Sequence, residues 1–376
     1  MGCATDNAPL LLAATSARAL AQSARRGGFA VRVLDRFGDL DTRAAADGFA
    51  LWPETAGAVA LARLGRALDP AAALVYGAGF EGAAESLRAL AAGRRLYGNA
   101  PEVLERLGEP RALFELFALL RIPHPEVRFR PPRRLDGWLC KDAGGCGGMG
   151  VGPARVQAGC PAGRYWQRRL NGPVHSLLFL ADGERLQVVG WNRLDACRID
   201  HGHPYAYAGA CGRAAPPAHL RGAALRHARR LVRALGLVGL NGIDFIVAGA
   251  RVRLLELNPR PGASFALYDA DWPGGLLRAH VGACGGRLPV AGRTPPGPAR
   301  AQRVLYAAVE TRIPPDFHWP EWCADLPRPG SAVAAGEPVC SVLAEAPTAG
   351  AARHQGARRV ARLRRLLGHA GCRRAA

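Results

Sequence analysis

A predicted β-hairpin in residues 242–260 carries three oxygen-bearing side chains on one face. Two apolar segments flank residues 249–251, which contain a glycine and predict a tight turn. With a three-residue turn, Asp244 and Glu256 stand opposite each other, and Asn258 shares the face of Glu256 because strand side chains alternate. This hairpin constrains the interpretation of the whole chain.

The two carboxylates of the hairpin need a compensating charge. Each loses hydration on burial and repels the other, so a cation or a proton must lie between them. Oxygen ligands favour a hard cation such as Mg²⁺ or Mn²⁺, which keeps some waters and is shared with substrate phosphates. Arg260, just past the second strand, can then hold a phosphate or carboxylate through two hydrogen bonds. The alternative is that Asp244 and Glu256 are solvated residues of an edge hairpin.

The basic composition comes almost wholly from arginine. The 376 residues carry a formal charge of +20, and Lys141 is the one lysine among 50 basic residues. This skew favours coding bias in a GC-rich genome over a selected basic surface. It also makes Lys141 informative, because lysine offers a compact ammonium where arginine offers a planar fork. The charge attracts polyanions, nucleotides included, but no zinc-finger, basic-zipper or RNA-binding motif supports nucleic acid as a partner.

The first hundred residues alternate strands with helices. The predicted strands are 9–14, 30–34 and 74–77, and the predicted helices are 16–26 and 81–91. This alternation indicates a parallel sheet covered on both faces. No G-x-G-x-x-G follows the first strand, so the usual dinucleotide site is not indicated. The segment 77–79, Gly-Ala-Gly, fits either a ligand crevice or an ordinary turn.

A glycine-rich segment follows the strand that carries the single lysine. Residues 138–142 predict this strand, and six of the nine residues in 144–152 are glycine. Such a segment lets backbone N–H groups approach a phosphate, with Lys141 adding charge just before it. It is not a Walker P-loop, because the lysine precedes the glycines. The alternative is a flexible linker.

Antiparallel strands and one amphipathic helix fill the middle of the chain. The predicted strands are 164–170, 174–180 and 186–191, and the predicted helix is 220–235. Arg193, just after the third strand, is a candidate clamp for a substrate carboxylate, with a surface arginine as the alternative. His201 and His203 suggest a metal, but no third ligand lies at a recognisable spacing, so a solvated loop is preferred.

The cysteines and the hydropathy pattern indicate the cellular compartment in which we expect the protein to be found. Ten cysteines occur without a C-x-x-C pair, which argues against a zinc ribbon and a dithiol redox motif and favours reduced thiols. No apolar stretch approaches transmembrane length. We therefore expect a soluble, cytoplasmic protein.

These features in this order, with a D-x(11)-E-x-N-P-R constellation, resemble the ATP-grasp superfamily over about residues 8–345. In detail the chain is similar to carboxylate–amine ligases related to biotin carboxylase. A narrower similarity is to ATP-grasp proteins of the tetrahydromethanopterin and methanofuran pathways in methylotrophs, whose relatives include tyramine–glutamate ligases. The resemblance implies an α/β and α+β architecture, an ATP-grasp fold with an N-terminal Rossmann-like parallel sheet domain.

The same resemblance divides the chain into regions. The implied divisions are a Rossmann-like domain (1–97), a small lobe with the glycine-rich loop (98–165), a large lobe with the Mg²⁺ and ATP site (166–290), a small C-terminal β element (299–345) and a flexible basic tail (346–376).

It also implies a role for each site residue. Lys141 matches the lysine at the nucleotide, Gly144, Gly145, Gly147 and Gly148 the loop over the phosphates, and Gln167, Arg168 and Leu170 the strand that reads adenine. Asp244, Glu256 and Asn258 match the Mg²⁺ ligands, and Arg260 the arginine at the transferring phosphate or acyl phosphate. The chain departs from the family with Gln167-Arg168 where many members have Gln-Glu, and with Glu109-Pro110-Arg111 where many have Asp-Lys.

The implied activity is ATP- and Mg²⁺-dependent ligation of a small-molecule carboxylic acid to an amine through an acyl phosphate. The relatives resembled are commonly dimers, which implies a homodimer. Two other classes stay open. One is a nucleotide-binding regulatory module without turnover, and the other is a basic nucleic-acid-binding protein, whose binding would fall steeply with salt.

Overall fold

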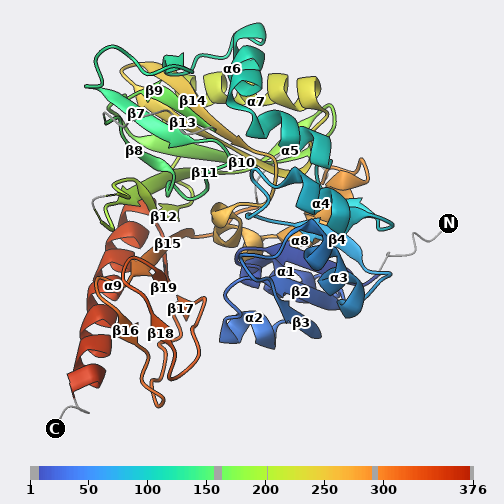
Figure 1. Cartoon of the computed structure of the whole chain (residues 1–376), viewed down its shortest axis with the longest axis vertical. Coiled ribbons are helices and arrows are strands. Elements are labelled where there is room, and N and C mark those ends of the chain that lie inside the picture. The colour runs from blue at the N-terminus through green and yellow to red at the C-terminus, as the bar shows by residue number, and fades with distance from the viewer. Residues whose placement is uncertain (1–7, 156–162, 201, 290–294, 373–376) are drawn as a thin grey trace.

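The computed structural model describes residues 8–155, 163–200, 202–289 and 295–372, and the statements below concern these residues. Figure 1 shows the N-terminal parallel-sheet domain in blue beside a larger β-rich body, with the C-terminal helix in red at the far end of that body.

The N-terminal domain is a five-stranded parallel sheet in the order β3-β2-β1-β4-β5. Its strands are β1 (Leu10–Ala14), β2 (Val31–Asp35), β3 (Gly48–Leu51), β4 (Ala73–Tyr76) and β5 (Leu96–Tyr97), and its helices are α1 (Arg18–Arg26), α2 (Leu40–Ala44), α3 (Ala58–Leu68) and α4 (Ala84–Ala91). Alternate residues of β1 enter two different cores: Leu10 and Leu12 pack with α1, and Leu11 and Ala13 pack with α3 and α4. The sheet is therefore covered on both faces, as predicted.

A four-stranded antiparallel sheet, β6-β9-β7-β8, follows in the chain. Its strands are β6 (Val127–Arg128), β7 (Trp138–Asp142), β8 (Val151–Pro153) and β9 (Arg164–Arg168), preceded by α5 (Pro101–Gly108) and α6 (Pro110–Leu119). Lys141 in β7 pairs with Tyr165 in β9 and with Val151 in β8. The lysine thus lies in the middle of this sheet.

The largest sheet has eight strands in the order β14-β13-β10-β11-β12-β15-β19-β17. Its strands are β10 (Val174–Asp182), β11 (Leu186–Cys197), β12 (Ala206–Cys211), β13 (Val238–Ala248), β14 (Arg251–Asn258), β15 (Ala299–Tyr306), β17 (Cys323–Ala324) and β19 (Pro338–Ala346), and a separate pair is β16 (Thr311–Arg312) with β18 (Ala332–Val333). The remaining helical elements are α7 (Ala218–Leu235), η1 (Ala263–Leu267), η2 (Asp269–Asp271), α8 (Leu276–Cys284) and α9 (Ala349–Cys372). Helix α7 buries its apolar stripe against β10, β13 and β14 (Figure 1).

The C-terminal region differs from expectation in two ways. Strand β15 pairs with both β12 and β19, so residues 299–345 extend the central sheet instead of forming a separate element. The expectation of a flexible tail was wrong for residues 349–372, because they form helix α9. Ala352 and Leu363 of this helix are fully buried, and Arg353 binds Asp195 at 2.8 Å. Apolar residues spaced three and four apart give the helix a face that the sheet covers.

None of the helices in the described ranges is long and apolar enough to cross a bilayer.

Candidate functional site

Strands β13 and β14 bring Asp244 and Glu256 opposite each other, as predicted. The route differs from the prediction. The turn contains two residues, Gly249 and Ala250, and a β-bulge beside Asp244 shifts the register by one. Without the bulge, a two-residue turn would pair Asp244 with Leu255 and place Glu256 on the opposite face of the sheet. The bulge therefore creates the carboxylate pair.

The three predicted metal ligands lie together at the end of this hairpin. The Asn258 Nδ2 donates to the Asp244 Oδ2 at 3.4 Å. Burial and the Glu256 charge raise the pKa of Asp244, and burial raises that of Glu256, while the nearby Lys141 and Arg260 cations lower both. In the described ranges no three His, Cys, Asp or Glu side chains are arranged to hold a metal. The donor set is thus two carboxylates and an amide oxygen, which fits a hard cation that keeps waters.

Lys141 and Gln167 face this carboxylate pair from the smaller sheet. The Lys141 Nζ donates to the Gln167 Oε1 at 3.4 Å and lies 5.9 Å from the ring centre of Tyr165. Burial lowers the pKa of Lys141, and the charges of Glu256 and Asp244 oppose that shift. The Gln167 Nε2 is buried and finds no acceptor in the described part of the chain. A buried donor without an acceptor is suited to bind an acceptor atom of a ligand.

These residues line a cavity of about 660 Å³ between the two sheets, which we call the hairpin cleft. The lining of the hairpin cleft includes the charged side chains of Lys141, Asp244 and Glu256. It also includes apolar side chains, namely Leu139, Leu170, Leu178, Ile246 and Leu255. Arg168 also lines the cleft, and its guanidinium lies 5.6 Å from the ring centre of Trp138. A cavity that combines apolar and charged side chains suits a base joined to phosphates.

The glycine-rich loop closes one side of the cleft and is ordered. Gly144, Gly147 and Gly148 have φ values of +71°, +61° and +73°. A Cβ atom on Gly148 would lie 2.0 Å from the carbonyl oxygen of Tyr205. The backbone N–H of Tyr207 donates to the Gly147 oxygen at 2.8 Å. The loop is therefore fitted against the start of β12 and is no flexible linker. The four loop glycines predicted at the nucleotide, Gly144, Gly145, Gly147 and Gly148, all line cavities of the site.

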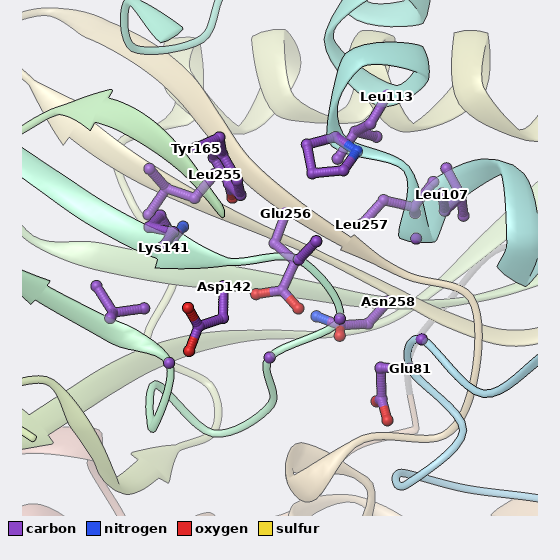
Figure 2. A pocket seen from close by; sticks show the side chains of 18 of the residues that line it. Glu81, Leu107, Leu113, Lys141, Asp142, Tyr165, Leu255, Glu256, Leu257 and Asn258 are labelled. Carbon is purple, nitrogen blue, oxygen red and sulfur yellow. The ribbon is translucent and has the colours of Figure 1, made fainter. Parts of the chain in front are cut away.

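Arg260 lies where the hairpin meets the N-terminal domain. It is 8% exposed, and its Nε donates to the Glu81 Oε1 at 2.5 Å. The same guanidinium donates to the Asn258 Oδ1 at 3.3 Å and to the Cys146 Sγ at 3.7 Å. Although burial opposes the shift, Arg260 holds the pKa of Glu81 below its ordinary value. Figure 2 shows Glu81 among the residues that line a smaller pocket, together with Lys141, Glu256 and Asn258.

Glu81 is the residue of the site that the sequence interpretation missed. Residues 81–91 were predicted as a helix, but α4 begins at Ala84, and Glu81 lies in the preceding loop, where it accepts a hydrogen bond from the N–H of Gly79 at 2.6 Å. The available signal was its position after Gly-Ala-Gly at the end of a predicted parallel strand, where open sheets bind ligands.

Arg193 does not reach the hairpin cleft. It pairs across the sheet with His175, which stacks on Phe245 at 5.8 Å on the face covered by α7. Asp244 points to the opposite face. The sequence interpretation ended the strand at Trp191, whereas β11 continues past Arg193 and fixes the direction of its side chain. The geometry therefore gives no support to the expected role of Arg193 as a carboxylate clamp in this cleft.

The described part of the structure does not support a metal site at His203. His203 pairs with Asp200 at 2.9 Å in an exposed loop. His201 lies outside the described residues.

A second cavity of about 610 Å³ lies at the carboxyl ends of the parallel strands, and we call it the sheet-end cavity. Its walls include Thr15 after β1, Asp39 after β2 and Gly77–Gly79 after β4. The Gly-Ala-Gly segment thus lines a crevice, which was one of its two predicted roles. The two cavities share Ala78, Cys146, Gly147, Tyr207, Gly262 and Ala263 in their walls, so they adjoin each other.

Comparison with known proteins agrees with this geometry. An ATP-grasp domain model matches residues 113–264. No curated protein matches the chain. Three similar solved structures are pyruvate carboxylase of Rhizobium etli (TM-score 0.73, 14% identity, 93% of this chain), biotin carboxylase of Campylobacter jejuni (0.70, 13%, 92%) and N5-carboxyaminoimidazole synthase of Aspergillus clavatus (0.71, 15%, 96%). The matches span 37%, 89% and 99% of those chains, respectively, so this chain corresponds to little more than a third of the pyruvate carboxylase.

Residues 113–264 thus match an ATP-grasp domain, which follows a parallel-sheet domain in the chain. The likeness of most of the chain to these solved structures confirms the fold expected from the sequence.

Proposed function

We propose that this protein is an ATP-dependent ligase that joins a carboxylic acid to an amine. The observation that carries the proposal is the junction at Arg260. There a cleft suited to a nucleotide and a hard cation adjoins a second cavity large enough for another small molecule. A nucleotide site alone would need only the first of these two spaces.

The hairpin cleft would hold ATP and Mg²⁺. Asp244, Glu256 and Asn258 would bind the Mg²⁺, which when bound neutralises charge on the phosphate oxygens. Lys141, the Gln167 amide and the backbone of the glycine-rich loop would bind the phosphates, and the apolar side chains of the cleft would contact adenine. In support, the related Campylobacter biotin carboxylase was solved as a β-γ-ATP complex, and the Aspergillus enzyme with ADP and 5-aminoimidazole ribonucleotide.

The proposed reaction has two steps. An oxygen of the acid attacks the γ-phosphorus of ATP, so that ADP leaves and an acyl phosphate forms. The amine nitrogen then attacks the acyl carbon, the C–O bond to phosphate breaks, and the nitrogen loses a proton. Arg260 would hold the acyl phosphate, and Glu81 would hold the guanidinium in position. The fitted glycine-rich loop would exclude water, which otherwise hydrolyses the acyl phosphate.

Three finer statements rest on the sequence resemblance alone. They are a role in the synthesis of methanofuran- or tetrahydromethanopterin-type C1 carriers, assembly as a homodimer, and the division of residues 1–290 into the first three regions given above. The similarity to the methylotroph proteins suggests the first, the similarity to the wider superfamily suggests the other two, and identification of the substrates tests the first.

Hydroxylamine allows a test without knowledge of the amine. The purified protein is incubated with Mg²⁺-ATP, a panel of carboxylic acids and hydroxylamine, and both ADP and hydroxamate are measured. A ligase releases ADP and forms hydroxamate with its own acid, and Glu256→Gln abolishes both. With an ¹⁸O-labelled acid, one ¹⁸O must appear in the phosphate.

Two outcomes contradict the proposal. Absence of ATP binding removes the nucleotide site itself. Tight ATP binding without ADP release for any acid, with natural amines in place of hydroxylamine as well, favours the regulatory module. Nucleic-acid binding that weakens steeply with salt would support the third class.

A further inference from the structure

Four aspartates gather where the N-terminal sheet meets the C-terminal region. Asp35 ends β2, Asp39 and Asp41 flank the start of α2, and Asp325 follows β17. Arg18 binds this group, with its Nε 2.7 Å from Asp325 and 3.7 Å from Asp41. Four carboxylates around one bound guanidinium leave a local negative charge, in a chain whose formal net charge is +20.

Three of the four carboxylates have structural partners. Asp35 accepts the backbone N–H groups of Ala17, Phe37 and Gly38 at 2.6–2.9 Å. Asp41 accepts the N–H groups of Asp325 and Leu326 at 2.9 and 3.0 Å. Asp325 accepts from Arg18 at 2.7 Å and from the Ser16 hydroxyl at 3.1 Å. These contacts tie α1, α2 and the C-terminal region together.

Asp39 is different. It is 8% exposed and lines the sheet-end cavity, and its carboxylate accepts no hydrogen bond from any residue in the described ranges. Burial, together with the charges of Asp325, Asp35 and Asp41, raises the pKa of Asp39 to about 8, and Arg18 offsets only part of this. The Asp39 carboxylate faces the cavity and makes no cap hydrogen bond to α2, and a largely buried carboxylate without a donor is costly. Its position therefore calls for a proton or for a cation that the protein does not supply.

The surroundings of Asp39 indicate what kind of cation fits. A metal ion needs several ligands that converge on one point, and no such group of acidic, histidine or cysteine side chains occurs in the part of the chain described here. The cavity beside Asp39 also has apolar walls, including Phe37, Phe265, Val304 and Val339. An organic cation with an apolar stem satisfies both the carboxylate and these walls.

We propose that Asp39 binds the protonated amine of a co-substrate held in the sheet-end cavity. The same cavity reaches Glu81 and Cys146, whose side chains accept hydrogen bonds from Arg260. The co-substrate thus spans the cavity, with an ammonium group at Asp39 and a second, reacting group at Arg260. This assignment rests on the proposed ligase function and narrows one of its substrates to a bifunctional molecule, either an amino acid or a diamine.

The test compares ammonium compounds with hydroxyl compounds of the same length. Binding to the full chain in Mg²⁺-ADP is measured by calorimetry and saturation-transfer NMR for two series of three to six carbons: ω-amino acids against ω-hydroxy acids, and diamines against amino alcohols. We expect one ammonium compound to bind more tightly than its hydroxyl counterpart. The two series distinguish an amino acid from a diamine.

The variant Asp39→Asn keeps the size of the side chain and removes its charge. We expect the preference for the ammonium compound to fall about 10- to 100-fold, which corresponds to the loss of a charge-assisted hydrogen bond. The affinity for ATP should stay unchanged, and the midpoint of thermal unfolding should not fall, because the variant removes a repelled charge. Glu85→Gln, a charge loss on the exposed face of α4, is the matched control and should leave the preference intact.

Several results overturn the assignment. They are equal binding of ammonium and hydroxyl compounds, absence of binding by every compound in both series, and an ammonium preference that survives in Asp39→Asn. Failure of the ligase function is read separately, from hydroxamate formation and ADP release. A protein that keeps the Asp39-dependent preference but forms no acyl phosphate loses the proposed reaction and keeps the cation site.

Discussion

The carboxylate of Glu81 and the guanidinium of Arg260 join two parts of the molecule that are 179 residues apart in the chain. Glu81 belongs to a loop of the parallel-sheet domain, and Arg260 follows the last strand of the hairpin. The ion pair is largely shielded from solvent, with side-chain exposures of 18% and 9%. The group proposed to hold the transferring phosphate is thus oriented by the neighbouring domain.

Glu81→Gln should destabilise the protein, because it leaves a buried guanidinium without its anion. We expect a loss of about 3 kcal/mol in the free energy of unfolding, measured with urea. The control is Glu102→Gln, which breaks an exposed pair with Arg88 at 3.3 Å and should cost less than about 1 kcal/mol. Equal losses in the two variants would contradict the structural role assigned to Glu81.

Lys141→Ala should remove nucleotide-dependent turnover while the fold remains. The ammonium is the one compact cation near the carboxylate pair, and loss of such a group costs on the order of 100-fold in rate or more. ADP release and ATP affinity are the measurements, with circular dichroism as the check on folding. Arg133→Ala, in an exposed loop, should change neither. Unchanged turnover in Lys141→Ala would exclude the lysine from the site.

Glu256→Gln should raise the thermal stability of the protein relative to the wild type when Mg²⁺ is absent and lower it relative to the wild type when Mg²⁺ and ADP are present. Without the metal, the substitution relieves repulsion with Asp244 and should raise the thermal midpoint. With Mg²⁺ and ADP, the wild type should gain stability by binding, and this gain should be lost in the variant. After treatment with a chelator, the variant should again have the higher thermal midpoint. A variant that still gains stability from Mg²⁺ would contradict the assigned ligands.

Alanine substitutions at two adjacent glycines distinguish the effect of backbone strain from the effect of a steric clash. Gly147 and Gly148 both have positive φ, but a Cβ atom at Gly147 meets nothing within 4 Å, whereas one at Gly148 would lie 2.0 Å from the Tyr205 oxygen. Both alanine variants strain the backbone by about 1 kcal/mol. We expect Gly148→Ala to lower ADP release at least about tenfold further than Gly147→Ala, because loop placement governs how the reacting groups are held. Similar losses would mean that Tyr205 does not position the loop.

His280 should make the fold less stable in mild acid. Its Nδ1 accepts the N–H of Leu240 at 2.8 Å, its Nε2 lies 3.0 Å from the Tyr97 oxygen, and burial lowers its pKa to about 4. Between pH 6.5 and 4 the unfolded chain takes up a proton that the folded chain refuses, so stability falls with pH in that window by about 3 kcal/mol. Urea unfolding at pH 7 and pH 4 measures this, and the fall should be smaller in His280→Gln than in the wild type and in the exposed control His219→Gln.

The sequence predicted the carboxylate pair because strand alternation and hairpin pairing are local rules. It reached the correct pairing with a wrong turn length, since the bulge beside Asp244 compensates for a turn of two residues. The same local rules located Lys141 and the glycine-rich loop. Features that depend on neighbouring residues in the chain were therefore accessible without the structure.

The errors concern contacts between distant segments or the ends of elements. Glu81 and Asp39 owe their environments to Arg260 and Asp325, which no local pattern connects to them. The face on which Arg193 lies was not foreseen, because the predicted strand ended at residue 191 and β11 continues to Cys197. The arginine-rich composition of α9 hid an apolar stripe that was present in the sequence, namely Ala352, Gly356, Val360, Leu363 and Leu367.

The single lysine gives this protein a chemical handle of its own. Reagents that acylate lysine amines have one side-chain target in the chain, and it lies in the wall of the hairpin cleft. Its lowered pKa increases the neutral, nucleophilic fraction of that amine at a given pH. A mass shift at one peptide would therefore report whether the cleft is open or filled, and protection by a bound molecule could be followed without any engineered label.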